Sequence, residues 1–538
     1  MRRSLPLAAV LTAITLTLTL GACSERPVAA PRQSSTPVIA APEATFVYSS
    51  IHDVITEWDP ATANSNEIIA LQNIYDTLTV YNPVTKRAAP RLATFWKASS
   101  DARTWTFELR SGVRFHTGRA LDAAAVKASI DRTRRQKGGA VYIWDAVDDI
   151  KVAGPLTVIF TLKYPAPLDL IASSGYGAYI YDTAAAGKGD LKAWFGAGRD
   201  AGTGPYTVGS WNKGAETELR LRHFAGFWGG WDGSRYRNVE FRVTPDPKAA
   251  WRLLLRGEVS FVSRFSTPLF RQAVATGGIR TSRASSFQNM LLLFNTASGP
   301  LRDVRLRKAV RDVLDHNALI KALKGAAVAP SGLVPDGLLG HISGRRPRQN
   351  LAEARRLLQA AGYGPTGREL RLRLTYAKGD DDQRLLVTML AARLARLNVR
   401  LDARAMQWNA QWDRGKSENP ADRQDIYAMY WWLDYADAYS WFINLFHSAD
   451  PVSFNLTYLA DKAIDRRIDE LPMLVATDHA AAQRSYAALQ RDLIDKRAVA
   501  VVTWVTTYQR AYLGGIRNYT DNPAYPNVVF VHELEPRG

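Results

Sequence analysis

Residues 239–262, VEFRVTPDPKAAWRLLLRGEVSFV, hold the pattern that decides the fold class. The first five residues alternate apolar and polar, which indicates a strand with one buried face. Asp246 and Pro247 are the residue types that cap and open a helix, and Gly257 is typical of a helix end. Apolar residues return at the end of the stretch as a second strand. A strand, a short helix and a strand in this order predict a mixed α/β sheet.

The same two periodicities continue on both sides of this stretch. Residues 65–81 carry apolar side chains at helical spacing and predict a helix. Apolar residues alternate over 105–115 on both sides of a Ser-Gly pair, which predicts a hairpin. Residues 350–362 contain a helix with clear start and stop signals, and 370–406 predict a strand, a helix and a strand. The whole chain is therefore expected to be α/β.

Composition excludes several classes of protein. The 538 residues are 46% hydrophobic and 22% charged, an ordinary globular composition with length for roughly three domains. A single cysteine excludes a disulfide framework and a cysteine-based metal site. The net charge is +18, but the basic residues are spread along the chain without interleaved aromatics, so a nucleic-acid partner is not expected. We also find no P-loop, His-Glu-x-x-His or Gly-x-Ser-x-Gly motif, and we expect no cofactor and no metal site.

The N-terminus carries export signals. Two arginines precede an uncharged apolar run over 5–20, which is too short for a membrane span and typical of a signal peptide. The sequence LGAC at 20–23 matches a bacterial lipobox, so we expect removal of 1–22 and lipidation of Cys23. Residues 23–43 contain four prolines and no aromatic residue, which predicts a flexible tether. The protein is thus expected on the periplasmic side of the envelope, held by lipid, with inner or outer membrane left open.

Short motifs follow one another in a characteristic order and spacing over about 44–515. They are LATFW (92–96), TWTFELRSGVRFHTG (104–118), GTGPY (202–206), FWGG (227–230), FNT (294–296), DVRLRKA (303–309) and WWLDYAD (431–437). Taken together they resemble the family 5 extracellular solute-binding proteins, the receptors that feed oligopeptide, dipeptide and nickel ABC importers.

The resemblance implies an α/β fold, a two-lobed periplasmic binding protein of type II, similar to cluster C. The first lobe is then expected over 44–75, 201–285 and 505–538, an additional α/β domain over 76–200, and the second lobe over 286–504. Two or three strands are expected to cross between the lobes as hinges. Closure around a ligand would present a surface to a membrane permease whose ATPase drives import. A monomeric receptor rather than an enzyme is expected.

A peptide enclosed between lobes needs a fixed anion for its ammonium group, because an unpaired buried charge is costly. Asp434 follows an apolar run and matches the family position that receives the peptide's amino terminus. The alternative is a role as helix N-cap, for which Asp437 competes. Trp431 is expected to face the cleft, and Tyr430 stands where many relatives carry Gly. Further ligand-binding candidates, each also consistent with a structural role, are Ser50, Ile51, Tyr176, Gln288, Asn289 and Trp408.

The function that follows is capture of dipeptides or oligopeptides for import. Three other ligands remain open within the same fold: an oligosaccharide, an opine and a nickel chelate. A secreted glycosidase with two carboxylates far apart in sequence is the alternative from a different class.

Overall fold

The computed structural model describes residues 44–136, 138–265 and 267–536. The predicted signal peptide, Cys23 and the tether lie outside these residues. None of the helices within the described ranges is long and apolar enough to cross a membrane.

One large mixed sheet runs through the described residues in the order β15-β14-β16-β12-β17-β11-β1-β10-β9-β8, with β13 beside β17. Its strands are β1 (Thr45–Ser50), β8 (Tyr206–Trp211), β9 (Thr217–His223), β10 (Asn238–Val243), β11 (Phe261–Val262), β12 (Ile279–Phe294), β13 (Ala327–Val328), β14 (Leu370–Ala377), β15 (Val399–Met406), β16 (Ile426–Trp431) and β17 (Ala500–Leu513). We call the part built on β1 and β8–β11 the first lobe, and the part built on β13–β16 the second lobe.

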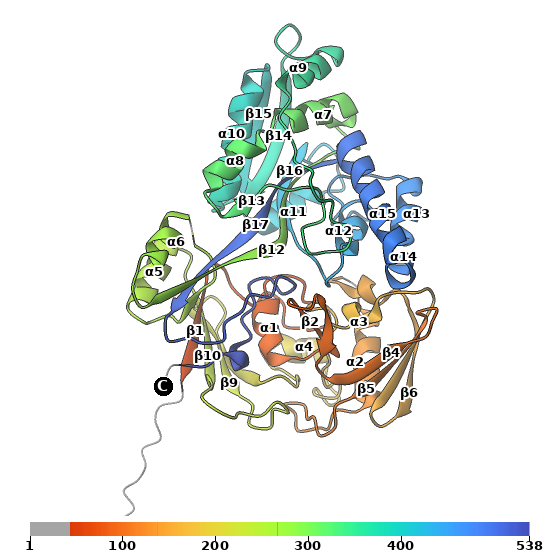
Figure 1. Ribbon diagram of the computed structural model, residues 1–538, viewed down its shortest axis with the longest axis vertical. Helices are drawn as coiled ribbons and strands as arrows, with labels where there is room; N and C mark the ends of the chain where they lie inside the picture. Colours follow the sequence, from red (N-terminus) through yellow and green to blue (C-terminus); the bar gives the residue numbers. More distant parts are fainter. Residues whose placement is uncertain (1–43, 137, 266, 537–538) are drawn as a thin grey trace, which may run out of the picture. The chain divides into compact units, whose positions relative to one another are not determined.

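The long antiparallel strands β12 and β17 join the two lobes (Figure 1). Their ladder runs from the pair Ile279–Leu513 to the pair Ser285–Thr507 in the first lobe, and it resumes at Asn289 opposite Val505 in the second. Between the two parts, residues 286–288 of β12 lie opposite the single residue 506 of β17. We call this irregularity the ladder break. An unequal count of residues bends a strand pair locally, so the ladder break is where the lobes are connected and where the connection is weakest.

The strand–helix–strand prediction for 239–262 is confirmed. Helix α5 (Pro247–Leu255) begins after Asp246, whose side chain accepts a hydrogen bond from the backbone N–H of Lys248. Both flanking strands, β10 and β11, pair parallel with β1. The crossover therefore passes over β1, which lies between its two strands.

The predicted helix over 65–81 is wrong in length. Helix α1 spans only Ile68–Ile74, and the chain then becomes extended and enters β2 (Thr79–Asn82), which pairs with β3 (Arg87–Pro90). Asp76 marks the change, because its buried carboxylate accepts hydrogen bonds from Arg91, Thr203 and Trp228. The apolar residues after Ile74 keep the spacing of a helix by coincidence. The hydrogen bonds from these distant donors to Asp76 hold the chain in an extended conformation there.

The predicted hairpin over 105–115 is also wrong. Strand β5 (Thr104–Leu109) pairs with β4 (Ala93–Ala98) on one side and β7 (Thr157–Leu162) on the other, in a sheet that β6 (Val147–Gly154) completes. Both edges of β5 are occupied, so the second apolar run turns back on itself, with the Phe115 N–H donating to the Arg119 carbonyl at 2.9 Å. The alternation correctly predicts which side chains are buried, but the two apolar runs do not pair with each other as predicted.

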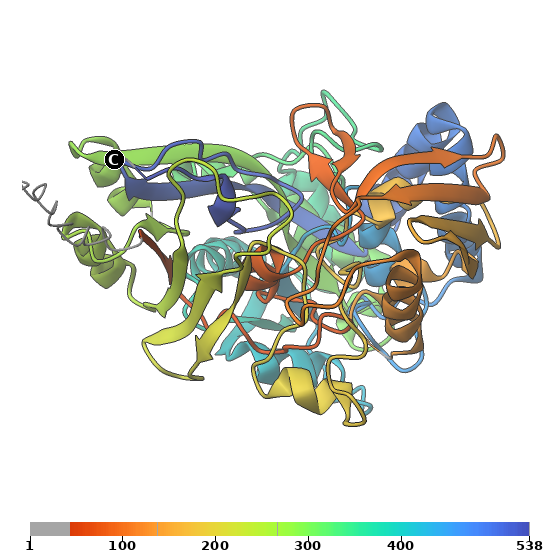
Figure 2. The same ribbon diagram turned by 90° about the horizontal axis from the view of Figure 1, so that it is seen from below.

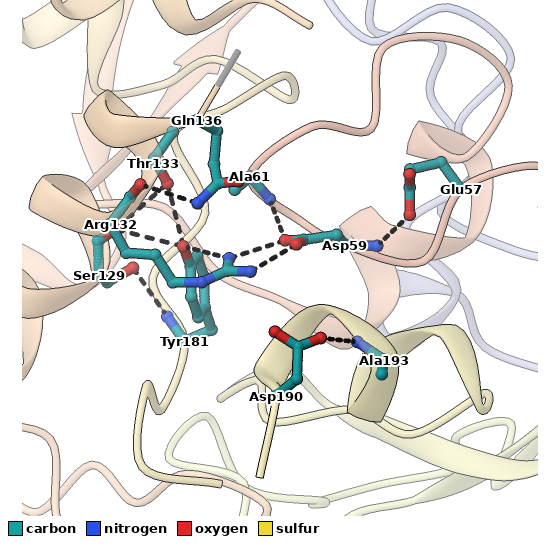
Figure 3. A network of polar contacts seen from close by, with 10 residues as sticks. All are labelled: Glu57, Asp59, Ala61, Ser129, Arg132, Thr133, Gln136, Tyr181, Asp190 and Ala193. Atoms are coloured by element: carbon teal, nitrogen blue, oxygen red, sulfur yellow. Dashed lines mark hydrogen bonds and ion pairs between the residues drawn. The ribbon is translucent and has the colours of Figure 1, made fainter. Parts of the chain in front are cut away.

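This antiparallel sheet of β4–β7, with helix α2 (Ala123–Arg135) packed on it, forms a side domain that is coloured orange in Figure 2. A buried ion pair fastens it to the first lobe, since Arg132 donates to both carboxylate oxygens of Asp59 (Figure 3). The Tyr181 hydroxyl accepts a further bond from Arg132 at 3.0 Å. The smaller helices of the first lobe and side domain are α3 (Leu168–Ile171), α4 (Leu191–Gly196) and α6 (Thr267–Val274).

Helices cover the sheet of the second lobe. Helix α10 (Asp381–Ala395) buries Leu386, Leu390 and Leu394 in the same apolar cluster as the leucines of β14. The predicted helix after residue 350 is confirmed, with the Asn350 side chain accepting from the Glu353 N–H. The helices of this lobe are α7 (Val304–Val313), α8 (His316–Leu323), α9 (Leu351–Ala360), α10 (Asp381–Ala395), α11 (Trp408–Gly415), α12 (Tyr439–Leu445), α13 (Lys462–Asp469), α14 (Leu471–Thr477) and α15 (His479–Gln490).

Two of the sequence motifs meet at the end of α1. A Cβ atom added to Gly202 of the GTGPY motif would lie 2.1 Å from the Ile74 carbonyl oxygen, so only glycine fits there. His116, from the longer motif at 104–118, contacts the Asp200 carboxylate, and its Nε2 lies 2.9 Å from the Gly204 carbonyl oxygen. The motifs thus hold the side domain against the first lobe.

We expect Gly202→Ala to lower the free energy of unfolding by about 1–3 kcal/mol, the usual cost of overpacking. Gly196→Ala is the matched control, because a Cβ atom there would meet nothing within 4 Å. Urea unfolding of both variants measures the difference. Equal stability of the two variants would contradict the packing argument.

Candidate ligand-binding site

A cavity of about 150 Å³ lies between the two lobes beside the ladder break. Both lobes and both joining strands contribute to its wall. The lining includes Ser50, Ile51 and Arg264 from the first lobe, Asp382 and Tyr430 from the second, and Gln288, Thr506, Tyr508, Gln509 and Arg510 from β12 and β17. A small, mostly polar ligand is the kind of molecule that this wall suits.

Strand β17 presents unpaired polar groups in this wall. The hydroxyls of Thr506 and Tyr508 and both amide atoms of Gln509 are buried and have no hydrogen-bond partner among the described residues. A buried donor or acceptor without a partner costs about 1–3 kcal/mol. Because these groups lie together at a cavity, a ligand that offers donors and acceptors would remove part of that cost.

Asp434 lies at a second contact between the lobes. Its Oδ2 accepts hydrogen bonds from the hydroxyl of Tyr142 in the side domain and from Asn444 Nδ2 of α12, the latter at 3.1 Å. Its backbone carbonyl accepts from the Ser174 hydroxyl at 2.6 Å. Burial raises the pKa of Asp434 to about 6, although the bonds from Tyr142 and Asn444 oppose that shift.

No lysine or arginine of the described ranges forms an ion pair with this carboxylate, and its partners Tyr142 and Asn444 are neutral. A carboxylate that is shielded from water and has no paired cation is unusual. The Asp434 carboxylate is partly buried and has no balancing cation among the described residues.

Of the two tryptophans before Asp434, Trp432 and not Trp431 contacts the side domain. Trp432 reaches the side domain, where its Nε1 donates to the Tyr176 hydroxyl at 3.0 Å. Trp431 turns into the second lobe and packs edge-on against Phe454, with ring centroids 5.2 Å apart. Successive side chains of a strand point to opposite faces, so Trp432 contacts the side domain, and Trp431, which was expected to face the cleft, packs inside the second lobe.

The other predicted residues fall into two groups. Ser50, Ile51, Gln288 and Tyr430 line the cavity. Among the residues outside its described lining, Asn289 is fully buried and donates to the Leu333 carbonyl oxygen at 2.6 Å, and Trp408 is 44% exposed and stacks on Trp412. Tyr176 is buried and contacts Trp432 instead.

Sequence reasoning missed Tyr142, Asn444 and Arg264. Tyr142 sits on a single helical turn, Val141–Trp144, and Asn444 is one of many polar residues on a short helix, so neither has a sequence signal. Arg264 is one of 69 basic residues. Its place directly after β11, at the same sheet edge as Ser50, is the signal that could have found it.

A larger cavity of about 300 Å³ lies within the second lobe, lined by Arg311, His316, Arg345 and neighbours. None of the predicted ligand residues belongs to its described lining. The described residues also contain no group of three or more His, Cys, Asp or Glu side chains placed to hold a metal ion. The cavity between the lobes is accordingly the site that we consider further.

We expect Asp434→Asn to stabilise the empty protein by up to about 3 kcal/mol at pH 7.5, because a folded-state pKa near 6 lies about two units above the ordinary value. As the pH falls through 6, the folded wild type takes up a proton and the advantage of the variant shrinks toward zero near pH 4. Urea unfolding across this range measures it. Asp336→Asn, at a 93% exposed side chain, is the control, and a variant no more stable than wild type at pH 7.5 would contradict the argument.

The comparisons with known proteins agree with this architecture. The chain is 24% identical over 490 residues to the probable D,D-dipeptide-binding periplasmic protein DdpA of Escherichia coli K12, covering 88% of this chain and 91% of that protein. It is 25% identical over 414 residues to the glutathione-binding protein GsiB of Shigella dysenteriae, covering 75% and 78%.

Among solved structures, the ABC transporter-associated periplasmic binding protein DppA of Helicobacter pylori, in complex with the peptide STSA, superposes with a TM-score of 0.77 at 21% identity. The match covers 92% of this chain and 98% of that one, and it shows that the two-lobed fold is shared. The family model of the bacterial extracellular solute-binding proteins, family 5, matches residues 87–452, well over half of the sequence. This chain belongs to the family 5 bacterial extracellular solute-binding proteins.

Proposed function

We propose that this protein captures short peptides between its lobes in the periplasm and delivers them to the membrane permease of an ABC importer, whose separate ATPase drives uptake. The names of the relatives, which refer to dipeptides and glutathione, support a peptide ligand. The observation that carries the proposal is the Asp434 carboxylate, which is partly buried between the second lobe and the side domain with neutral partners only. The ammonium group of a peptide supplies the missing cation.

The proposal includes the parts of the chain that do this. The first lobe comprises 44–75, 201–285 and 505–538, the side domain 76–200, and the second lobe 286–504. The ladder break lies within one residue or so of both boundaries between the lobes. Lipid on Cys23 would hold this receptor near the permease.

Isothermal titration calorimetry with Ala-Ala and N-acetyl-Ala-Ala tests the role of Asp434. Wild type is expected to bind Ala-Ala at least about 30-fold more tightly than the acetylated peptide, because truncating one partner of a buried charge pair costs about 2–5 kcal/mol. Asp434→Asn should lose this preference, and Asp336→Asn should keep it. If wild type binds the two peptides equally well, the proposed contact between Asp434 and the ammonium group is contradicted. Binding of an oligosaccharide, an opine or a nickel chelate, with no peptide bound, would replace the peptide proposal.

The affinity for Ala-Ala is also expected to depend on pH. Only the ionised carboxylate attracts an ammonium group, so the affinity should fall about tenfold per pH unit below the pKa of about 6 and stay nearly level to about pH 7. At pH 8 it should fall roughly twofold, because the α-amino group of the peptide, with a pKa of about 7.7–8.0, begins to lose its proton. Calorimetry at pH 5, 6, 7 and 8 measures the profile. A profile that is flat in wild type, or equally steep in Asp434→Asn, would exclude this carboxylate as the titrating group.

A further inference from the structure

The cavity of about 300 Å³ within the second lobe is the larger of the two described above, and the proposed function makes no use of it. Separate segments of the chain form its wall. They are the end of α7 with the start of α8, residues 330–332 and 345–348 between β13 and α9, residues 494–495 after α15, and the start of β17. A cavity of this volume lies at the lower end of the range for small-molecule sites.

The wall of this cavity carries a surplus of positive charge. Its charged residues are four arginines and two aspartates, namely Arg311, Arg345, Arg346, Arg348, Asp312 and Asp495. Each aspartate has an arginine partner, since Arg311 Nε donates to Asp312 at 2.8 Å and Arg345 donates to the Asp495 carboxylate. Arg346 and Arg348 are exposed and have no polar contact within the part of the chain that the structure describes. Two positive charges are therefore left for an anion.

His316 adds a buried acceptor to the same wall. It is 4% exposed, and its Nε2 lies 3.0 Å from the Val502 carbonyl oxygen, so Nε2 carries a proton and donates it. Burial lowers the pKa of His316, which keeps the ring neutral. The other nitrogen, Nδ1, is then an acceptor, and it is buried without a partner among the described residues. A hydroxyl group brought into the cavity satisfies it.

We propose that this cavity binds a phosphate dianion that has a hydroxyl group on it or next to it. Arg346 and Arg348 pair with the phosphate oxygens, because the planar guanidinium suits bidentate contact with phosphate and the surplus charge equals that of the dianion. The hydroxyl group donates to His316 Nδ1. Inorganic hydrogen phosphate and the phosphate ester of a small polyol both have this chemistry. The proposal is independent of peptide capture, since the described linings of the two cavities share no residue.

Sulfate distinguishes this arrangement from a general attraction of anions to a basic surface. At pH 8 sulfate and inorganic phosphate are both mainly dianions of similar size, but only phosphate has an O–H group. Sulfate therefore leaves His316 Nδ1 unpaired and places an oxygen lone pair against it. Because an unpaired buried acceptor is costly, phosphate should bind at least about fivefold more tightly than sulfate. Glycerol 3-phosphate and propyl phosphate form the matching pair of esters, with and without hydroxyl groups.

Isothermal titration calorimetry at pH 8 with these four anions tests the proposal on wild type, R346Q/R348Q, R355Q/R396Q and H316F. Arg355 and Arg396 are the matched control, because they are exposed arginines of the second lobe, lie outside the described cavity lining and have no polar contact with described residues. R346Q/R348Q should bind the preferred anion at least about tenfold more weakly than wild type, and R355Q/R396Q within about twofold. H316F should lose the preference within each pair, and a change in its stability cancels in that ratio.

The outcomes decide both the site and the source of the phosphate. A preference for phosphate over sulfate that is lost in H316F supports an inorganic ligand, and a preference for glycerol 3-phosphate over propyl phosphate supports an ester. Equal binding within both pairs by wild type, or a preference that persists in H316F, overturns the role of His316. Absence of binding, or equal weakening in both double variants, overturns the site and leaves an adventitious ion only. If H316F does not fold, the wild-type ratios and the double variants still decide.

Discussion

The connection of the two lobes depends on the backbone ladder between β12 and β17. A buried strand must pair its N–H and C=O groups along its length. These two strands pair with each other in both lobes, so one part of the ladder belongs to the sheet of the first lobe and the next part to the sheet of the second. The ladder shifts register at 286–288 opposite 506, where it passes from one lobe to the other, and once more between Met290 and Leu291 within the second lobe. A bend is easiest where backbone bonds are absent, so one irregularity supplies both a flexible joint and the position of the cavity.

The polar part of the cavity wall adjoins the same irregularity. Thr506 lies at the ladder break, and Tyr508 and Gln509 follow it in the part of β17 that pairs with 283–284 of β12; the polar side-chain atoms of all three lack a partner among the described residues. Buried side-chain atoms without a partner also occur elsewhere in the described residues, for example in Trp58, Thr62 and Tyr75. At the cavity four such atoms lie within 506–509 of one strand, and a ligand is a means of satisfying them.

Buried carboxylates show the contrast clearly. Asp59 is held by Arg132, Asp76 by Arg91, and Asp521 by Arg510. Asp434 has only neutral donors, as do the buried Asp437 and Glu218, whose donors belong to the same lobe. The Tyr142 donor of Asp434 instead comes from the side domain, and in the proposed function the ammonium group of the ligand supplies the cation.

The sequence predicted what local chemistry determines. Caps and stops placed α5 and α9 correctly because these signals act over a few residues. The hairpin prediction for 105–115 failed because β5 pairs with β4 and β7 instead. A local pattern does not show whether a strand pairs with the next segment or with one about fifty residues away. For the site, Ser50 and Tyr430 could be found from their places on strands. Tyr142 and Arg264 could not, because their importance comes from contacts between segments more than a hundred residues apart.

Charge also couples closure to the ligand. Part of the burial of Asp434 comes from Tyr142 and Ser174 on the opposite side, so closing the empty protein takes an ionised carboxylate out of water. A pKa near 6 corresponds to roughly 3 kcal/mol against the charged form above that pH. The half-exposed contacts of Arg264 across the lobes return about 1 kcal/mol at most. Since only part of the burial arises on closure, closure without ligand is then opposed by at most about 2 kcal/mol, or roughly 30-fold. In the proposed function a ligand with an ammonium group removes this opposition by neutralising Asp434.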